Sequence, residues 1–357
     1  MLIHKIKKGL ALMGKYCLNS VPNKWELIYI IENANWSTDW DGWQITRELN
    51  RKNLLRAKTD TMACGYKNKI IHLGSIPVSS EIKNINRDNK IVQTIFHIGD
   101  KHWPQIKQIK KNLSRISWLH TSCLDTKSKL MSAGVPESKI KVIPLGIDLE
   151  IFQPASHNAR QIIREKLNLP KNKIIIGSFQ KDGNGWAEGR EPKLIKGPDI
   201  FCDVVIELSK KYPIHVLLTG PARGYVKKRL AMAGVTFAHQ YLKNYNDLVP
   251  YWQALDLYLI TSRVEGGPKA LLEAWATGVP IISTKVGMVP DIAVDNETAI
   301  LVEVGDIQAL IAGAEKIITN QEFGQRLAAA GLDEIEKYSW IKIAERYYQE
   351  VYQPLDI

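Results

Sequence analysis

The sequence predicts an α/β protein built from two doubly wound domains. The chain has 357 residues, which is too many for one ordinary hydrophobic core and suits two domains of about 150 to 180 residues. Strand-like apolar runs alternate with helical patterns through most of the chain, and the alternation occurs twice. Several runs are almost continuous in Ile, Val and Leu, as parallel strands are when helices cover both faces of their sheet.

The strand candidates form two sets. The first set comprises 26–33, 69–74, 90–99, 115–122 and 139–146, and the second comprises 173–179, 215–220, 236–241, 255–262, 279–284 and 299–304. Helical patterns lie between them, of which 197–212, 268–278 and 306–320 are the clearest, and a helical pattern at 338–352 ends the chain. A boundary is expected within 146–161, where Pro154, Ser156 and Asn158 follow the first set.

Composition excludes several classes of protein. The chain is 45% apolar and 24% charged, and no stretch has the roughly 18 uncharged apolar residues of a membrane-spanning helix. The first residues indicate an amphipathic helix or arm rather than an export signal, because Lys15 follows a short apolar run. Cys17, Cys64, Cys123 and Cys202 have neither metal-type nor redox-type spacing, which fits a reducing cytoplasm.

The positive charge lies in the first part of the chain. Residues 1–150 carry 24 Lys and Arg against 13 Asp and Glu, whereas residues 151–357 carry 24 of each, so the whole excess of +11 belongs to the first part. It is dense at 101–115, where a helix would bring Lys107, Lys110, Lys111 and Arg115 near one face. Such a face can meet nucleic acid, an anionic bilayer or an acidic acceptor, or it can be merely solvated.

The stretch that carries the chemistry runs from Thr261 to Thr284 and reads TSRVEGGPKALLEAWATGVPIIST. It follows a buried strand, and open α/β sheets bind ligands at the carboxyl ends of their strands. Pro268 suits the first position of a helix, and Gly278 suits a left-handed stop. The N-terminus of this helix would offer free N–H groups to a phosphate. Gly266 and Gly267 would let the backbone approach that phosphate closely.

Glu265 and Glu273 stand eight residues apart around this turn, and neither carboxylate can serve the phosphate that it would repel. Both are better explained as acceptors for sugar hydroxyls at the two ends of a ligand with phosphate in its middle. A nucleotide sugar has this layout, with Glu273 on the ribose and Glu265 on the transferred sugar. The plain alternative is a surface loop and a helix with glutamates that face solvent.

These residues and the following ATGVPIISTKVGMVPDI resemble the signature of retaining glycosyltransferases of family 4. The stretches 135–152, 251–267 and 338–352 resemble other parts of the family, and the resemblance covers roughly 90–352. It implies the GT-B fold, in which two Rossmann-like domains face each other across a cleft. The implied domains are an acceptor-side domain at 1–152, a nucleotide-sugar-binding domain at 153–335, and a helix at 336–357 that returns to the first domain.

The resemblance also implies two cations for the donor diphosphate, usually an Arg just after the strand at 173–179 and a Lys about five residues later. This chain departs from that pattern with Gln180-Lys181 and a glycine-rich excursion before Lys196. Lys196 is assigned to the family Lys. Lys181 is preferred for the Arg role and Arg190 is the second choice, while solvated loop charges remain the alternative. Lys269, beside Pro268, is grouped with the donor-binding residues.

Four further candidates rest on position within the implied fold. His97 ends a strand of the first domain, where related enzymes have a His that faces the donor sugar, although a core histidine is the alternative. Asp100 lies near enough to orient a group. Tyr241 can stack on the base of the donor. Asp41-Gly42 lies in 36–43, a loop expected near the acceptor, although capping of the next helix is the simpler interpretation.

The function that follows is retaining transfer of a hexose from a nucleotide-diphosphate sugar to a hydroxyl of a glycan or lipid-linked acceptor. No cluster of His, Asp or Cys has metal-ligand spacing, so no metal or other cofactor is expected. We expect a cytoplasmic protein, with the basic first domain docking at an anionic membrane and with no nucleic-acid partner. The alternatives are a non-catalytic binding protein of the same fold and a nucleotide-sugar epimerase, for which acid and base residues are lacking.

Overall fold

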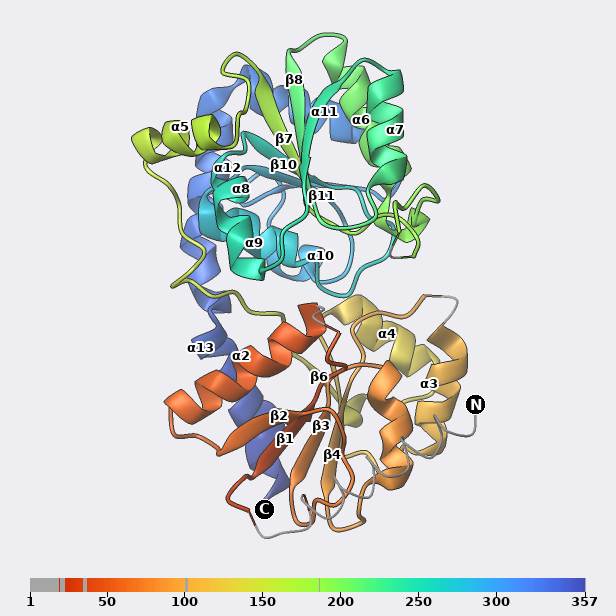
Figure 1. Cartoon of the computed structure of the whole chain (residues 1–357). Helices are drawn as coiled ribbons and strands as arrows, with labels where there is room; N and C mark the ends of the chain where they lie inside the picture. The colour runs from red at the N-terminus through yellow and green to blue at the C-terminus, as the bar shows by residue number, and fades with distance from the viewer. Residues whose placement is uncertain (1–18, 20–22, 35–36, 100–101, 186, 357) are drawn as a thin grey trace. The chain divides into compact units, whose positions relative to one another are not determined.

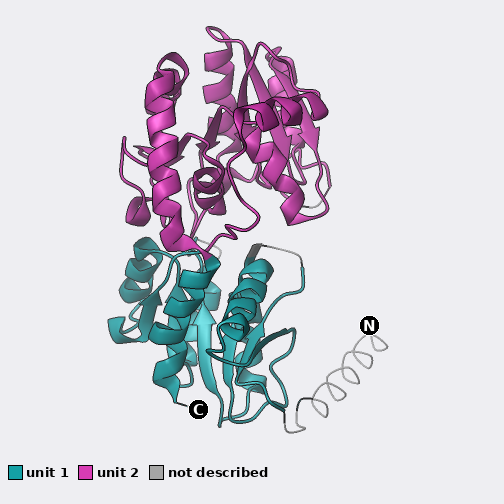
Figure 2. Cartoon of the chain, turned by 90° about the vertical axis from the view of Figure 1, so that its left-hand side faces the viewer, with its two compact units in different colours: residues 1–145, 340–357 teal, residues 146–339 magenta. Residues whose placement is uncertain are grey.

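The computed structural model describes residues 19, 23–34, 37–99, 102–185 and 187–356. The chain divides into two units (Figures 1 and 2): unit 1 comprises Met1–Leu145 and Trp340–Ile357, and unit 2 comprises Gly146–Ser339. These bounds lie a few residues from the division at 152 and 335 given by the sequence. Phe152 falls in unit 2, because its buried ring lies 5.3 Å from the ring of Tyr245, centroid to centroid.

Unit 1 is built on a six-stranded parallel sheet with the order β2-β1-β3-β4-β5-β6. Its strands are β1 (Leu27–Ile30), β2 (Ala57–Asp60), β3 (Ile70–Leu73), β4 (Lys90–Thr94), β5 (Trp118–Thr121) and β6 (Ile140–Val142). Its helices include α2 (Ser37–Arg51), α3 (Trp103–Lys111), α4 (Leu124–Ser132) and α13 (Trp340–Tyr347).

Alternate residues of these strands serve the two faces of the sheet. Ile28 and Ile71 share one core cluster with Ile106 of α3 and Leu130 of α4. Tyr29, the neighbour of Ile28, packs instead against Gly42 of α2, where a Cβ would lie 2.6 Å from the Tyr29 ring. The sheet is therefore covered on both sides, as the apolar runs predict (Figure 1).

Three details of unit 1 differ from the sequence predictions. The edge strand β2 has no apolar run to reveal it. The stretch that was expected to be a loop at 36–43 is helical from Ser37, so Asp41-Gly42 lies inside α2 and Asp41 does not cap it. Helix α3 ends at Lys111, and Arg115 beyond it donates hydrogen bonds to the carbonyls of Ile85 and Asn86 (3.2 and 3.3 Å).

Unit 2 is built on a second parallel sheet, with the order β12-β11-β10-β7-β8-β9. Its strands are β7 (Ile174–Ser178), β8 (Ile214–Thr219), β9 (Thr236–Gln240), β10 (Leu257–Ile260), β11 (Ile281–Thr284) and β12 (Ile300–Val302). Its helices are α5 (His157–Lys166), α6 (Pro198–Ser209), α7 (Gly224–Met232), α8 (Val249–Gln253), α9 (Lys269–Thr277), α10 (Val289–Ile292), α11 (Ile307–Thr319) and α12 (Gln321–Glu334). All six strands match the predicted runs.

The order of unit 2 fixes where a ligand is expected. The chain builds β7, β8 and β9 outward to one side, then crosses over and builds β10, β11 and β12 to the other side. Adjacent strands β7 and β10 therefore form the switch point of a doubly wound sheet, and the crevice beyond their carboxyl ends is the usual binding place. The loops that follow these two strands hold Lys181, Lys196 and Glu265.

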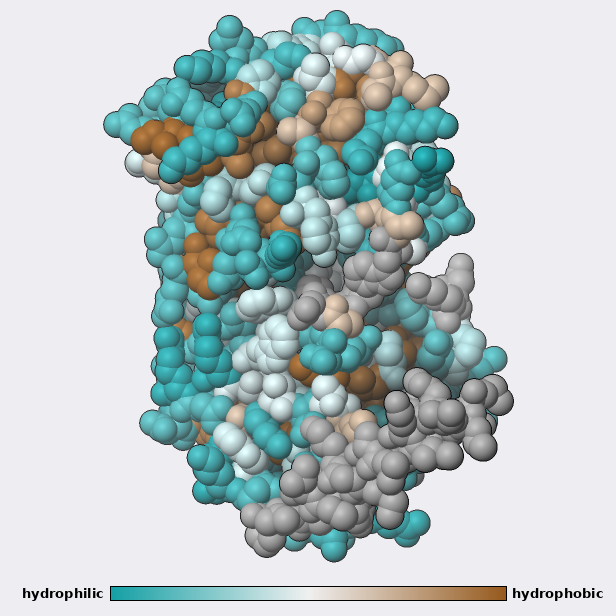
Figure 3. Space-filling model, viewed as in Figure 1, coloured by the Kyte–Doolittle hydropathy of each residue, from teal (hydrophilic) through white to brown (hydrophobic). Residues whose placement is uncertain are grey.

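The surface is largely hydrophilic on the face of Figure 3, with apolar side chains gathered over α5, the helix whose Ile162 is 52% exposed. Among the described residues, no helix has both the length and the hydropathy to cross a membrane.

Candidate active site

The site begins with the loop between β10 and α9, which starts at Thr261. Helix α9 starts at Lys269, so Pro268 is the capping residue rather than the first helical residue, and no side chain caps the helix there. The N–H of Leu271 donates to the carbonyl of Pro268 (3.1 Å), and the first helical turn carries the positive end of the helix dipole. Gly278 ends the helix in the left-handed conformation (φ 68°), as predicted.

The loop is held from the side by the segment that follows β11. The N–H of Met288 donates to the carbonyl of Gly266 (2.8 Å). Gly287, with φ 54°, approaches so closely that a Cβ there would lie 2.3 Å from that same carbonyl oxygen. Two glycines thus let two loops pack backbone against backbone, which fixes the position of Glu265.

Lys196 and Glu265, separated by 69 residues in sequence, form one ion pair at the switch point. The Lys196 Nζ lies 2.6 Å from Oε1 and 2.7 Å from Oε2 of Glu265. The Ser262 hydroxyl donates a third hydrogen bond to Oε1 (2.8 Å). Glu265 is 8% exposed, so this carboxylate is held in the protein by three hydrogen bonds. The structure brings together two residues that the sequence placed at the same site.

The absence of a side chain at Gly197 allows the segment that carries Lys196 to pack against the end of β10. Gly197 has φ 63°, and a Cβ would lie 1.8 Å from the carbonyl oxygen of Thr261. The Thr261 hydroxyl donates a hydrogen bond to the carbonyl of Gly197 (2.8 Å). The N–H of Arg263 donates one to the carbonyl of Ile195 (2.8 Å). Two further bonds of 2.8 and 2.7 Å join the Arg263 guanidinium to Asp199. The short 3-10 helix Leu194–Lys196 is therefore fastened to the end of β10.

Glu273 lies inside α9 and is 5% exposed. The Tyr245 hydroxyl donates to its Oε1, and the Trp252 indole N–H donates to its Oε2 (3.1 Å). Burial raises the pKa of the Glu273 carboxyl above its ordinary value, while these two donors and the Lys269 ammonium oppose the shift. Both oxygens thus face protein donors, and the predicted contact with ribose remains a prediction.

Sequence reasoning named Tyr241 and missed Tyr245. Tyr241 follows β9 and is 57% exposed. Tyr245 instead contacts Glu273, and its ring lies 5.7 Å from the Lys269 ammonium. Both tyrosines belong to one stretch, YLKNY, so composition alone did not distinguish them.

The two candidates for the second phosphate cation differ in surroundings. Lys181 is half-buried in the loop directly after β7. Arg190 is 81% exposed on the glycine-rich excursion, where its Nε lies 2.8 Å from the Glu188 carboxylate. The position of Lys181, nearer the switch point, favours it for the role.

A buried arginine that the sequence reading overlooked holds the ends of β7 and β8. Arg223 donates to the carbonyls of Ser178 (2.6 Å) and Thr219 (2.7 Å), and it lies 3.0 Å from Asp182, with both side chains fully buried. Burial raises the pKa of Asp182, and Arg223 offsets only part of the shift. Since Asp182 follows Lys181 directly, this pair fixes the base of the loop that carries Lys181.

Unit 1 holds the remaining candidates. His97 is half-buried beyond β4, with its ring 4.8 Å from that of His102, centroid to centroid. Asp41 is buried in α2, and Gly42 beside it contacts Tyr29. Asp100 lies outside the described residues. A contact of His97 with the donor sugar and contacts of Asp41, Gly42 and Asp100 with an acceptor stay predictions.

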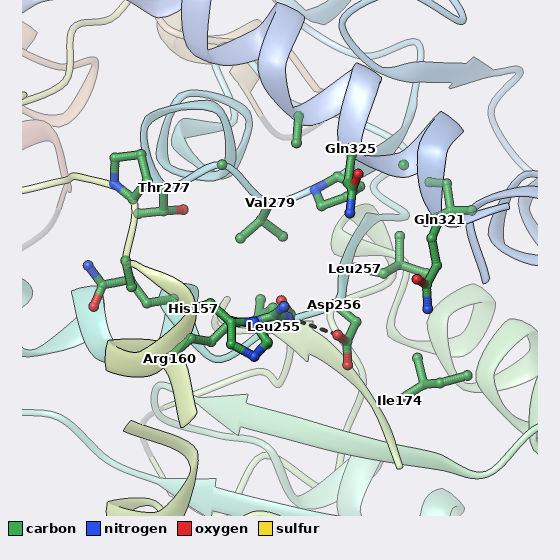
Figure 4. A pocket seen from close by; sticks show the side chains of 18 of the residues that line it. His157, Arg160, Ile174, Leu255, Asp256, Leu257, Thr277, Val279, Gln321 and Gln325 are labelled. Atoms are coloured by element: carbon green, nitrogen blue, oxygen red, sulfur yellow. Dashed lines mark hydrogen bonds and ion pairs between the residues drawn. The ribbon is translucent and has the colours of Figure 1, made fainter. Parts of the chain in front are cut away.

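One pocket of unit 2 lies away from these residues. It has a volume of 490 Å³ and is lined by side chains of α5, α12 and the amino ends of β7, β10 and β11, among them His157, Arg160, Asp256 and Gln321 (Figure 4). The Glu265 loop lies at the opposite ends of the same strands. Within the described ranges, no cluster of three His, Cys, Asp or Glu side chains is arranged to hold a metal ion.

Comparisons with known proteins show what the chain is similar to. Residues 190–333 match the family described as glycosyl transferases group 1. A D-inositol 3-phosphate glycosyltransferase of Corynebacterium urealyticum is 26% identical over 231 residues, which cover 61% of this chain and 52% of that protein. The lipopolysaccharide core biosynthesis mannosyltransferase LpsB of Rhizobium meliloti is 29% identical over 227 residues, which cover 60% of each chain. The matched region thus spans about half to three fifths of these relatives.

A solved structure extends the likeness over most of the chain. The Anabaena protein HepE in complex with UDP-glucose has a TM-score of 0.77 at 15% identity, covering 92% of this chain and all of that one. At this identity the likeness concerns the fold alone, and it confirms the predicted GT-B fold.

Proposed function

Because residues 190–333 match the family described as glycosyl transferases group 1, we propose that the chain is a retaining hexosyltransferase. It transfers a hexose from a nucleotide-diphosphate sugar to a hydroxyl of a glycan or lipid-linked acceptor. The observation that carries the proposal is the meeting of Lys196, Glu265 and the uncapped end of α9 at the switch point. A cation and the positive end of a helix dipole suit a diphosphate, and a carboxylate beside them suits sugar hydroxyls.

Each residue then has a place along the donor. The diphosphate binds at the first turn of α9, beside Gly266 and Gly267, with Lys196 and Lys181 as its cations. Glu265 binds the hexose, Glu273 binds the ribose once its present donors yield, and Tyr241 stacks on the base. That HepE binds UDP-glucose and that LpsB is a mannosyltransferase supports a hexose donor.

The chemistry needs few protein groups. The acceptor hydroxyl attacks the anomeric carbon from the face that the diphosphate leaves, and the departing phosphate oxygen takes the proton of that hydroxyl. Glu265 positions the sugar rather than moving the proton. The cations and the helix end stabilise the charge that develops on the leaving phosphate, the task that a metal ion performs in other transferases.

We further propose that the enzyme works in the cytoplasm in polysaccharide biosynthesis, with its acceptor at an anionic membrane surface. The excess of 11 positive charges in residues 1–150 supports this placement, because anionic lipid attracts clusters of lysine. His97, on the same unit, is assigned to a hydroxyl of the donor sugar.

A thermal-shift screen of the full chain against UDP, GDP, ADP and their sugars tests the proposal. The true donor at saturating concentration is expected to stabilise the protein by about 2–4 kcal/mol. Slow hydrolysis of that donor would separate a transferase from a binding protein, because transferases release sugar to water at a low rate. A protein that none of these ligands stabilises would not be a nucleotide-sugar enzyme.

A further inference from the structure

The Lys196–Glu265 pair joins two groups that the proposed function assigns to different parts of the donor. Resting on that function, we propose that Glu265 competes with the diphosphate for Lys196, so that the ion pair re-forms once the hexose has left and favours release of the nucleoside diphosphate. The sugar-bearing donor and the sugar-free product would then differ in affinity through a lysine that neither the base nor the ribose touches.

The geometry makes the two contacts competitive. An ammonium group has three N–H donors, and the Lys196 Nζ lies within hydrogen-bond distance of both Glu265 oxygens (2.6 and 2.7 Å). Only one donor is left over, so a phosphate that takes more than one N–H of this ammonium draws it from the carboxylate, and it also brings negative charge towards a second anion. Lys196 is 24% exposed at its side chain and Glu265 only 10%, so the lysine is the partner with room to turn towards a ligand.

The hexose decides the outcome of this competition. Removing the cation from a buried carboxylate costs free energy unless other hydrogen-bond donors replace the cation. Hydroxyls of a bound hexose provide such donors, and Lys196 is then released to the diphosphate. When the hexose departs with the acceptor, Glu265 keeps only the Ser262 hydroxyl (2.8 Å), and recovering Lys196 becomes favourable. Sugar and phosphate binding are thus coupled through one side chain.

Inorganic pyrophosphate tests the coupling, because it carries neither sugar nor base. Its dissociation constant is measured by isothermal titration calorimetry on the wild-type chain, E265Q, K196M and the double variant. E265Q removes the competitor with little change of shape, and it is expected to bind pyrophosphate roughly tenfold more tightly, within the usual range of coupling between contacting residues. K196M is expected to bind more weakly than wild type.

The double variant separates competition from simple repulsion. If Glu265 acts by holding Lys196, E265Q gives almost no gain in the K196M background. If it acts only by repelling anions, the tenfold gain persists there and the proposal is overturned. E273Q is the matched control, since it removes a nearby carboxylate that is bound by Tyr245 and Trp252 instead of Lys196. Its gain in pyrophosphate affinity is expected to stay below about twofold, which is just under the lower end of the coupling range.

A second variant, E265D, tests the same proposal if E265Q does not fold. E265D keeps the charge, but its shorter side chain cannot hold the ammonium on both oxygens, so a gain of about threefold is expected. Equal or weaker pyrophosphate binding by the folded E265Q or E265D would also overturn the proposal. A wild-type chain that binds neither pyrophosphate nor any nucleotide in the screen would instead overturn the proposed function itself.

Discussion

Glu265 and Glu273 are both buried, but the hydrogen-bond donors around their carboxylates differ. Glu265 accepts from a lysine and a serine, whereas Glu273 accepts from the neutral donors Tyr245 and Trp252. Burial is the largest influence on Glu273 and raises its pKa. An ionised Glu273 therefore costs stability at neutral pH, because a carboxyl with a raised pKa in the folded state favours folding only when it is protonated.

Glu273→Gln is expected to separate stability from function. The amide keeps the shape, its oxygen can accept from Trp252, and its NH2 group can donate to the Tyr245 hydroxyl, so the buried charge disappears without an orphaned donor. We expect the free energy of unfolding in urea to stay equal or to rise by up to about 1 kcal/mol, since one pKa unit corresponds to about 1.4 kcal/mol. The affinity for the donor nucleotide should fall at least about tenfold. An unchanged nucleotide affinity would show that Glu273 does not bind the ribose.

The sequence pointed to the two carboxylates because strand, glycine turn and helix lie close together in the chain, and the family resemblance pointed to Lys196; their contacts with a donor stay predictions. The sequence did not identify Tyr245 or Arg223. Their roles arise from contacts with residues 28 and 45 positions away, Glu273 and Ser178, and no local pattern marks such a pairing. The capping role considered for Asp41 failed for a related reason. Helix α2 starts at Ser37, and the Asp39 carboxylate accepts from the N–H groups of Glu32 and Ala34 (2.9 and 2.7 Å).

At the scale of elements, the site depends on how closely the segment before α6 can approach β10. Gly197→Ala is expected to displace Lys196, because the added Cβ would meet the carbonyl oxygen of Thr261 at 1.8 Å. Backbone strain at the left-handed φ of 63° adds about 1 kcal/mol. We expect a loss of about 3 kcal/mol or more in the free energy of unfolding, together with loss of transfer activity.

Gly234→Ala is the matched control for this variant. Its φ is 70°, but no atom lies within 4 Å of the added Cβ, so only the backbone strain remains. A loss of about 1 kcal/mol with full activity is expected. Equal losses in the two variants would show that the contact with Thr261 does not matter.

The elements themselves were largely predictable. Eleven of the twelve strands coincide with apolar runs, because parallel strands covered on both faces need continuous Ile, Val and Leu. The exception is β2, whose sequence AKTD lies at an edge of the sheet and needs only one neighbour, β1. Tertiary pairing, rather than local pattern, makes it a strand.

At the scale of the whole chain, α13 and the π-helical segment Tyr348–Tyr352 that follows it join the sheet of unit 1 through buried polar contacts. His72 of β3 bonds to the Tyr352 hydroxyl (2.7 Å), and His120 of β5 bonds to the Tyr347 hydroxyl (2.9 Å). The Thr94 hydroxyl joins the two histidines (2.7 and 2.9 Å). Burial lowers the pKa of His120 to about 4 and that of His72 well below its ordinary value, so both rings are neutral.

This network predicts loss of stability in mild acid. In the unfolded chain these histidines take up protons below a pH of about 6.5, whereas in the folded chain they do not, so stability is complete above that pH and falls as the pH approaches 4. Urea unfolding at pH 7.5 and pH 5 should differ by about 2 kcal/mol from His120 alone. H120Q should flatten the dependence, and H157Q, which changes an exposed ring, should not. The same pH dependence in wild type and H120Q would contradict the assignment.

The charge of the chain predicts a surface for membrane contact. Lys107, Lys110 and Lys111 are exposed on α3. Sedimentation with vesicles that contain anionic lipid is expected at low salt and should weaken at high salt, because the attraction is screened. Replacing the three lysines by glutamate should reduce binding, whereas neutral vesicles should bind neither protein. Equal sedimentation of the wild-type chain and the triple variant with anionic vesicles would show that α3 does not contact the membrane.

The most direct measurement is a crystal structure of the full chain with the nucleotide sugar that gives the largest thermal shift. We predict the diphosphate at the first turn of α9, within hydrogen-bond distance of the Lys269 and Ala270 N–H groups and of the Lys196 ammonium, with the hexose on Glu265. A diphosphate bound elsewhere in unit 2, for example in the 490 Å³ pocket between α5 and α12, would contradict the assignment of the site.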